Sequence, residues 1–289
     1  MTTRGIGLVF NLFKLRIGIV IALTALAGAA ITPGAAPPAL QLAVLALAVL
    51  VSSASAGAFN QYYEAELDRT MDRTRSRPFV TGVLRHHRGW LALILLMIVA
   101  AVAAAWHAVN PVAALFTFLG AFFYAVVYTV WLKRRTWWNI VIGGLAGSFA
   151  VLAGSAAVTP GLSSEALLLA LVLFLWTPPH FWSLAIAYRE DYARAGVPML
   201  PVVKGDAFAA RAIFANTVLL VAASLLPALF GSGWIYVAGA VAGGGVFIWY
   251  GVKLVANPGR RAAMACFHAS LLQLSLLLVA AMVDSAVAG

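Results

Sequence analysis

Long apolar runs separated by short polar segments repeat along the whole chain. The hydrocarbon core of a bilayer is about 30 Å thick, and a helix needs about 20 apolar residues to cross it. Runs of this kind recur nine times and are continuously apolar, which predicts helices and not the alternating strands of a membrane barrel. The expected spans are residues 16–33, 39–59, 89–108, 111–131, 138–159, 165–187, 208–230, 233–255 and 263–284.

The positive charges lie in alternate gaps between these runs. All 19 lysines and arginines fall before the first span or around the gaps that follow the even-numbered spans. A missing or an additional span would move some of them to the other side, so their segregation supports the number of spans. The positive-inside rule makes this side cytoplasmic. We therefore expect a multi-pass protein of the bacterial inner membrane, with a cytoplasmic N-terminus and a periplasmic C-terminus.

Composition agrees with a membrane protein. The 289 residues are 63% hydrophobic and 10% charged, whereas soluble domains have about 45–50% apolar and about 25% charged residues. The formal charge of +10 would suit nucleic acid, but the basic residues sit in short gaps between spans, so we expect the lipid bilayer and no nucleic acid as partner. No linker divides the chain, which predicts a single integral-membrane domain over residues 1–289.

The first group of candidate functional residues follows the second span. Asn60, Glu64, Asp68 and Asp72 recur every four residues and share one face if the span continues as a helix. Like charges at this spacing destabilise a helix, so a counter-ion is expected, and oxygen ligands without His or Cys suit Mg²⁺. The alternative is a solvated charged helix held by local Glu/Arg pairs.

Three arginines of the same segment keep this period one residue further round the helix. They are Arg69, Arg73 and Arg77, and they would place cations beside the carboxylate face. Cations beside a magnesium site are typical of a site for a magnesium-bound diphosphate.

The second group lies in and after the sixth span, in the segment Trp176-Thr-Pro-Pro-His-Phe-Trp182. The two prolines remove helix hydrogen bonds, which predicts a disturbed helix beside a cavity. His180 follows them directly and could contact a substrate or ligate iron as neutral imidazole. The alternative is a core histidine bonded to a carbonyl that the prolines free, and both interpretations stay open. Asp191 follows this span, and we expect it to be a second metal ligand that faces the first carboxylates. Spans two and six thus both lead into acidic, arginine-bearing segments, which suggests an internal duplication.

The third group is the basic segment after the fourth span. Lys133 and Arg134 follow Tyr124 and Tyr128 at the expected cytoplasmic helix end. Cations there can be simple topological anchors. Diphosphate also binds to Lys and Arg through charge-assisted bonds, so we expect at least one of the two cations to serve both purposes.

Together these segments resemble the protoheme farnesyltransferase family of UbiA-type intramembrane prenyltransferases. The resemblance rests on Asn60 with residues 68–78, on Lys133-Arg-Arg-Thr with Asn139-Ile-Val-Ile-Gly-Gly, and on residues 176–182 with Asp191-Tyr and Pro198-Met-Leu-Pro201. The chain departs from the family in having Glu64 and Glu66 where Asp is common, and Leu15 where Pro separates Lys from Arg. These departures leave a carboxylate at both acidic positions.

The resemblance implies an all-α bundle of nine transmembrane helices around a central cavity. It implies transfer of farnesyl from farnesyl diphosphate to a vinyl group of heme b with addition of water, giving heme O and diphosphate. It assigns Mg²⁺ as cofactor, with Asn60, Glu64, Asp68, Asp72 and Asp191 as ligands. Asp68, Asp72, Asp191 and Lys133 are the implied catalytic residues, and the implied substrate-binding residues are Arg16, Arg77, Arg134, Tyr128, His180 and Trp182.

Two other functions fit parts of the pattern. A UbiA-type enzyme that prenylates a quinone precursor or another aromatic acceptor would share the diphosphate chemistry, and the segment around His180 argues against it. A cation-coupled transporter could use the acidic ladder, but transport residues lie near the bilayer midplane and these lie at one membrane edge. The resemblance also implies heme A synthase or a terminal oxidase assembly as a protein partner.

Overall fold

A computed structural model describes residues 3–288 and the side chains of residues 7–287. This part of the chain has eight helices that are long and apolar enough to cross a membrane, and a ninth apolar helix, α2, that is shorter. Its 17 residues lie at the lower limit for a span. The nine apolar helices correspond to the nine predicted runs. They are α2 (Leu15–Ile31), α3 (Ala39–Tyr63), α5 (Gly89–Ala108), α6 with η1 (Pro111–Phe122, Phe123–Leu132), α7 with α8 (Asn139–Gly143, Leu145–Val158), α9 (Ser164–Ala187), α12 with η2 (Asp206–Leu225, Leu226–Phe230), α13 (Trp234–Ala256) and α14 (Arg260–Ala288).

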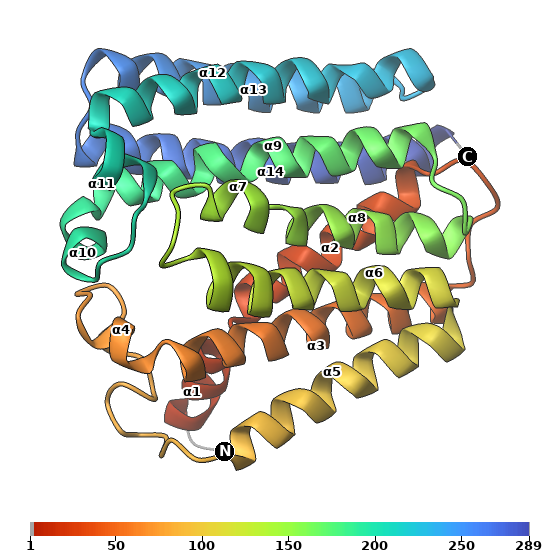
Figure 1. The fold of residues 1–289 in the computed structure, drawn as a ribbon. Coiled ribbons are helices and arrows are strands. Elements are labelled where there is room, and N and C mark those ends of the chain that lie inside the picture. Colours follow the sequence, from red (N-terminus) through yellow and green to blue (C-terminus); the bar gives the residue numbers. More distant parts are fainter. Residues whose placement is uncertain (1–2, 289) are drawn as a thin grey trace.

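Four short helices complete the described chain, and three of them gather at one end of the bundle. The four are α1 (Thr3–Leu12), α4 (Ala65–Arg69), α10 (Arg189–Arg194) and α11 (Leu200–Lys204). Helices α4, α10 and α11 lie together on the left in Figure 1. We call this end the cap and define it as residues 64–88, 133–138 and 188–205. Charged residues that are far apart in the sequence therefore meet in the cap.

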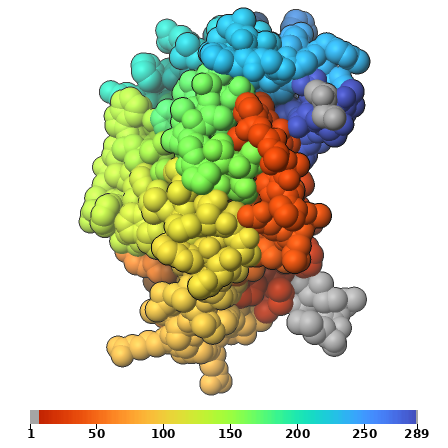
Figure 2. All heavy atoms as spheres, turned by 90° about the vertical axis from the view of Figure 1, so that its right-hand side faces the viewer, coloured from red at the N-terminus to blue at the C-terminus, as the bar shows by residue number. Residues whose placement is uncertain are grey.

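The helices form an elongated bundle with α2 in its middle. Helix α2 contacts α3, α8, α9 and α14. Helix α5 packs outside on α3 and α6, while α12 and α13 pack outside on α9 and α14. Seen from the end opposite the cap, α12 and α13 lie at one extreme and α5 at the other (Figure 2). The inner helices therefore surround the space in which a ligand could bind.

Two glycines let α2 and α8 touch backbone to backbone. A Cβ atom on Gly154 would lie 1.7 Å from the carbonyl oxygen of Ala25, and a Cβ on Gly28 would lie 2.3 Å from that of Val151. Small residues permit such close approach of membrane helices. The contact fixes the half of α2 that lies away from the cap.

The acidic ladder is not one continuous helix, which corrects the prediction from its four-residue spacing. Helix α3 ends at Tyr63, Glu64 has φ −97° and ψ 12°, and α4 ends at Arg69. Asn60, Glu64 and Asp68 are buried, but Asp72 lies beyond α4 in a turn and is exposed. Helix α9 ends in the same way, with a break at Tyr188 before α10. The two halves of the chain thus repeat one arrangement at the cap.

The two prolines do not break α9, contrary to the expectation from the sequence. The helix runs from Ser164 to Ala187 through Pro178 and Pro179. Pro179 has no N–H to donate to the carbonyl of Leu175 four residues earlier. The side chain of Asn216 on α12 donates to this carbonyl instead, at 2.5 Å. A neighbouring helix therefore supplies the hydrogen bond that the proline removes.

Candidate active site

An apolar cavity of about 400 Å³ lies between the inner helices. Its volume is within the range of about 300–1,000 Å³ that is usual for ligand pockets. Helices α2, α3, α6, η1, α7, α8, α9 and α14 all contribute to its wall. The wall is mainly apolar, and Lys14, Tyr124 and Tyr128 line it together with His180 on α9. The cavity is thus suited to a large apolar ligand that carries an anionic group at one end.

The cavity reaches the outside of the bundle beside α2 and α14. Among its lining residues, Arg16, Ile17 and Val20 on α2 and Leu271 on α14 are exposed. A ligand with an apolar chain could therefore extend toward the hydrocarbon of the bilayer while its head remains near the cap.

Lys14 connects the cavity to the cap. Its ammonium nitrogen donates to the Oδ1 atom of Asn60 at 2.8 Å and to the hydroxyl of Tyr124 at 2.8 Å. Lys14 is the non-glycine residue with positive φ in the described chain, 48°, and it joins α1 to α2. The Nε2 atom of Gln61 donates to the carbonyls of Asn11 and Leu12 and so holds this junction against α3.

Asn60 extends the connection to the first carboxylate of the cap. Its Nδ2 atom donates to Glu64 at 2.8 Å and to the hydroxyl of Thr129 at 3.2 Å. The same oxygen of Glu64 accepts from Lys133, and both side chains are almost fully buried. A buried carboxylate needs such a partner, because an unpaired charge away from water costs several kcal/mol (about 3–5 when one partner is removed).

A π-helix brings Lys133 to the side of η1 that carries Tyr124 and Tyr128. In an α-helix of 3.6 residues per turn, Lys133 and Tyr124, nine positions apart, would lie on opposite sides. Residues 123–132 form the π-helix η1, in which the amide of Lys133 bonds to the carbonyl of Tyr128. Its wider turn brings Tyr124, Tyr128 and Lys133 to one side, and the two tyrosine rings stack with centroids 5.7 Å apart.

Asp68 and Arg77 form a second buried pair in the cap. The Nη1 atom of Arg77 lies 2.5 Å from Asp68 Oδ2, and Asp68 is 1% exposed. Thr74 donates to the carbonyl of Asp68 and holds the turn that returns Arg77 to the carboxylate.

The two acidic stretches of the sequence are in direct contact. The amide of Arg73 donates to the buried carboxylate of Asp191 at 3.2 Å. The Nη2 atom of Arg194 contacts Asp191 at 2.5 Å and Asp72 at 2.8 Å. Residues of the turn that follows α4 therefore meet residues of α10, as the pairing of two acidic segments predicted.

In the described part of the chain, no three His, Cys, Asp or Glu side chains form a group that could hold a metal ion. The carboxylates of Glu64, Asp68 and Asp191 are each paired with a cation instead. The donors are nevertheless oxygens only, and the Oε1 atom of Glu64 is buried without a hydrogen-bond partner among the described residues. Buried carboxylate and amide oxygens of this kind fit Mg²⁺.

His180 lies in the cavity wall, and its hydrogen-bond partner is not the freed carbonyl that the core-histidine alternative expected. Its Nδ1 atom is 2.7 Å from the hydroxyl of Ser270 on α14, so it is not bonded to a carbonyl freed by the prolines. The Leu175 carbonyl is bonded to Asn216. The imidazole ring stacks between Trp176, at 4.2 Å, and Phe267, at 4.4 Å between centroids.

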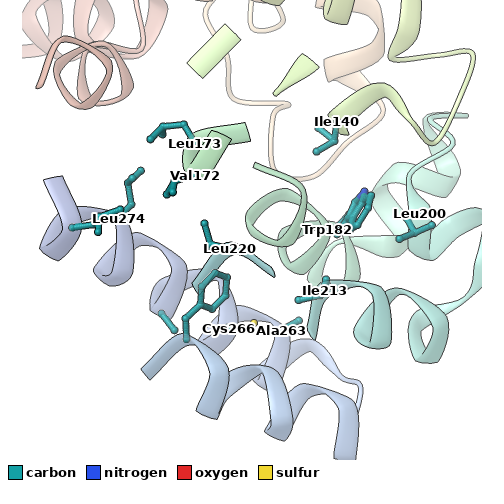
Figure 3. Packing of buried hydrophobic residues seen from close by; sticks show 14 of the residues in the cluster. Ile140, Val172, Leu173, Trp182, Leu200, Ile213, Leu220, Ala263, Cys266 and Leu274 are labelled. Atoms are coloured by element: carbon teal, nitrogen blue, oxygen red, sulfur yellow. The ribbon is translucent and has the colours of Figure 1, made fainter. Parts of the chain in front are cut away.

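The remaining predicted substrate-binding residues divide into two groups. Arg16 and Tyr128 line the cavity. Arg134 is exposed in the cap and makes none of the ion pairs of the described residues. Trp182 is absent from the cavity wall and lies in the hydrophobic core with Leu200 and Ile213 (Figure 3).

Sequence reasoning assigned no substrate contact to three residues that the structure places at the site. Lys14 was interpreted only as a topological charge, although its family-like spacing to Arg16 was a signal. Arg194 was likewise counted only among the basic residues of its gap. Ser270 lies in an apolar run with no local pattern that marks it, so its role required the packing of α9 against α14.

Comparisons with known proteins cover nearly the whole chain. A model of the UbiA prenyltransferase family matches residues 21–277. Protoheme IX farnesyltransferase 2 of Paramagnetospirillum magneticum is 58% identical over 287 residues, which are 99% of this chain and 100% of that protein. Protoheme IX farnesyltransferase 1 of the same organism is 50% identical over 276 residues, which are 95% and 96% of the two chains.

Solved structures share the fold at low sequence identity. A structure from work on digeranylgeranylglyceryl phosphate synthase superposes with a TM-score of 0.78 and 18% identity, covering 98% of this chain and 99% of the other. A UbiA homolog from Archaeoglobus fulgidus bound to DMAPP and Mg²⁺ superposes with a TM-score of 0.70 and 15% identity, covering 95% and 99%. At these identities the likeness concerns the fold alone.

Proposed function

Because the chain belongs to the UbiA prenyltransferase family, we propose that it transfers the farnesyl group of farnesyl diphosphate to a vinyl group of heme b. Water adds in the same reaction, and the products are heme O and diphosphate. One observation carries the proposal: the same apolar cavity has His180 and Lys14 in its wall, and Lys14 is connected through Asn60 to Glu64 of the cap. The names of the similar proteins support the choice of substrates.

In this reaction, residues of the cap and residues of the cavity wall would stabilise different charges. The C–O bond of farnesyl diphosphate breaks, the diphosphate leaves, and the vinyl electrons form a C–C bond to the allylic cation. Water then adds to the resulting carbon cation and loses a proton. Lys14, Arg77, Lys133 and Arg134 would stabilise the negative charge on the leaving group. The faces of Tyr124 and Tyr128 would stabilise the allylic cation.

We propose Mg²⁺ as the cofactor, held by Asn60, Glu64, Asp68, Asp72 and Asp191. When bound, the ion would neutralise charge on the diphosphate oxygens. The oxygen-only donor set and the free Oε1 atom of Glu64 support this choice. In this proposal the present cation partners of these carboxylates would turn toward the diphosphate.

Incubation of the purified protein with heme b, farnesyl diphosphate and Mg²⁺ tests the function, with the products read by mass spectrometry. We expect heme O and diphosphate, and we expect no product when EDTA replaces the metal. The matched acceptor arm contains 4-hydroxybenzoate in place of heme b. Prenylated 4-hydroxybenzoate without heme O would establish the alternative acceptor class and overturn the proposal.

The location of the protein follows from the same proposal. The polytopic chain would lie in the bacterial inner membrane with the cap in the cytoplasm. Farnesyl diphosphate and Mg²⁺ would then enter from the cytoplasm, and diphosphate would be released there. Heme A synthase or a terminal oxidase assembly would receive the product.

A further inference from the structure

Ser270 is the buried hydroxyl that determines how His180 faces the cavity. Ser270 is 0% exposed and lies on α14, opposite the histidine on α9. Its Oγ atom is 2.6 Å from the carbonyl of Phe267 and 2.7 Å from His180 Nδ1. A serine hydroxyl has one hydrogen to donate. Since the carbonyl of Phe267 can only accept, the hydroxyl donates to that carbonyl and accepts from His180.

This order of donors fixes the tautomer of the imidazole. Nδ1 carries the hydrogen, so Nε2 of the neutral ring has a free lone pair. Among residues 7–287, Nε2 of His180 makes no hydrogen bond. It is also not one of the buried polar atoms that lack a partner, so it is accessible, and His180 lines the cavity. The lone pair is therefore available to a ligand in the cavity.

Packing covers both faces of the imidazole ring, and Phe181 makes an edge-to-face contact with it, at 5.0 Å between centroids. Trp176 covers one face and Phe267 covers the other, at interplanar angles of 20° and 27°. The indole Nε1 of Trp176 also donates to the carbonyl of Ser270 at 2.8 Å, which fixes α14 against α9 at this level. Both helices thus hold the imidazole in one orientation.

A neutral imidazole with Nδ1 bonded to the protein and Nε2 directed into an apolar cavity is the arrangement of an iron ligand. Heme iron is commonly held by such a histidine. A role of Nε2 as a base for the added water is less suited to this site, because a charged imidazolium would form in a buried, mainly apolar wall, away from water.

We propose that His180 Nε2 ligates the iron of heme b and that Ser270 is the positioning residue that keeps this nitrogen unprotonated and directed at the metal. The inference rests on the proposed function, in which heme b is a substrate. Ligation would fix the porphyrin in the cavity and so determine which vinyl group faces the cap.

The test compares heme b with iron-free protoporphyrin IX, both added to the purified protein without farnesyl diphosphate. Ser270→Ala should weaken heme b binding by about 10–100-fold, as loss of a ligand's supporting bond does, and leave protoporphyrin IX binding unchanged. Ser270→Thr, which keeps the hydroxyl, should restore heme affinity. His180→Ala should lose the absorption and EPR signature of a histidine-ligated heme.

Ser183→Ala is the matched control, because Ser183 is an equally buried serine that also donates to a backbone carbonyl, that of Pro179, but makes no hydrogen bond to His180. Equal weakening of both porphyrins by Ser270→Ala would show a packing role only and overturn the proposal. A histidine signature that persists in His180→Ala would also overturn it. Heme O formation by the wild type, measured separately, distinguishes this failure from failure of the proposed function.

Discussion

Asn60 makes the hydrogen bonds that connect the cavity wall to the cap. Its amide group joins Lys14 from the start of the chain, Glu64 from the next turn and Thr129 from η1. The carbonyl oxygen is used by Lys14, and the amide nitrogen is used by the other two residues. An aspartate at this position could not donate to Glu64, so the neutral amide is what allows a cation and a carboxylate to lie on either side of one buried residue.

Asp68→Asn should abolish heme O formation while the protein still folds. The substitution removes the charge that we assign to metal binding and that pairs with Arg77. We expect turnover to fall by at least about 100-fold, since loss of one charge-stabilising group costs about 10²–10³ in rate. The measurements are heme O formation and thermal unfolding in detergent.

Glu190→Gln is the control for this change, because Glu190 is an exposed carboxylate of α10 in the same cap. It should keep wild-type turnover. Near-normal activity of Asp68→Asn would remove Asp68 from the metal site.

Residue types and spacing predicted part of this site and not the rest. Asn60, Glu64, Asp68 and Asp191 were found because polar and acidic side chains are costly near a membrane and therefore stand out. Lys14 and Ser270 were not, because a lysine at a helix start resembles a topological anchor and a serine in an apolar run resembles packing. Their contacts join positions 46 and 90 residues apart, which no local pattern contains.

Helix α9 shows how one element can tolerate residues that should break it. The prolines predicted a disturbance, and the helix continues because Asn216 on α12 replaces one lost hydrogen bond. Helix η1 shows the reverse case, in which a sequence that looks α-helical adopts wider turns and so brings Lys133 to Glu64. Both outcomes depend on neighbouring helices, so the periodicity of either segment alone could not predict them.

Asn216→Ala should destabilise the fold by about 1–3 kcal/mol, the cost of leaving a buried carbonyl without a donor. The bond is part-buried between two long apolar helices, α9 and α12, and the hydrocarbon of a bilayer would offer no donor in place of the amide. Asn257→Ala makes the same chemical change at the exposed end of α13 and should have little effect. An unchanged midpoint of thermal unfolding for Asn216→Ala would mean that the carbonyl has another partner.

At the scale of the whole molecule, the long apolar runs and the distribution of charge predicted the fold well. The order of the nine runs places the lysines and arginines at the end of the bundle where α4, α10 and α11 gather (Figure 1). Arg4 is excepted, because its side chain lies outside the described residues. Packing order and the break of the ladder at Glu64 were not predicted, since hydropathy states that a helix is buried in lipid and not which neighbour it contacts.

The orientation in the membrane can be measured with single cysteines. Cys266 is buried and would be replaced by Ala as background. Thr81→Cys lies in the cap and Gly161→Cys lies between α8 and α9, and both positions are exposed. An impermeant maleimide added to intact spheroplasts should label Gly161→Cys and reach Thr81→Cys only after permeabilisation. Labelling of Thr81→Cys alone in intact spheroplasts would reverse the proposed orientation.

The cation partners of the buried carboxylates have a consequence for the catalytic cycle. Glu64 is paired with Lys133, Asp68 with Arg77, and Asp191 with Arg194. Leaving such a carboxylate bare would cost about 3–5 kcal/mol. If these side chains turn to the diphosphate as proposed, they would return to the carboxylates when the pyrophosphate product leaves, so its departure would not leave bare negative charge behind.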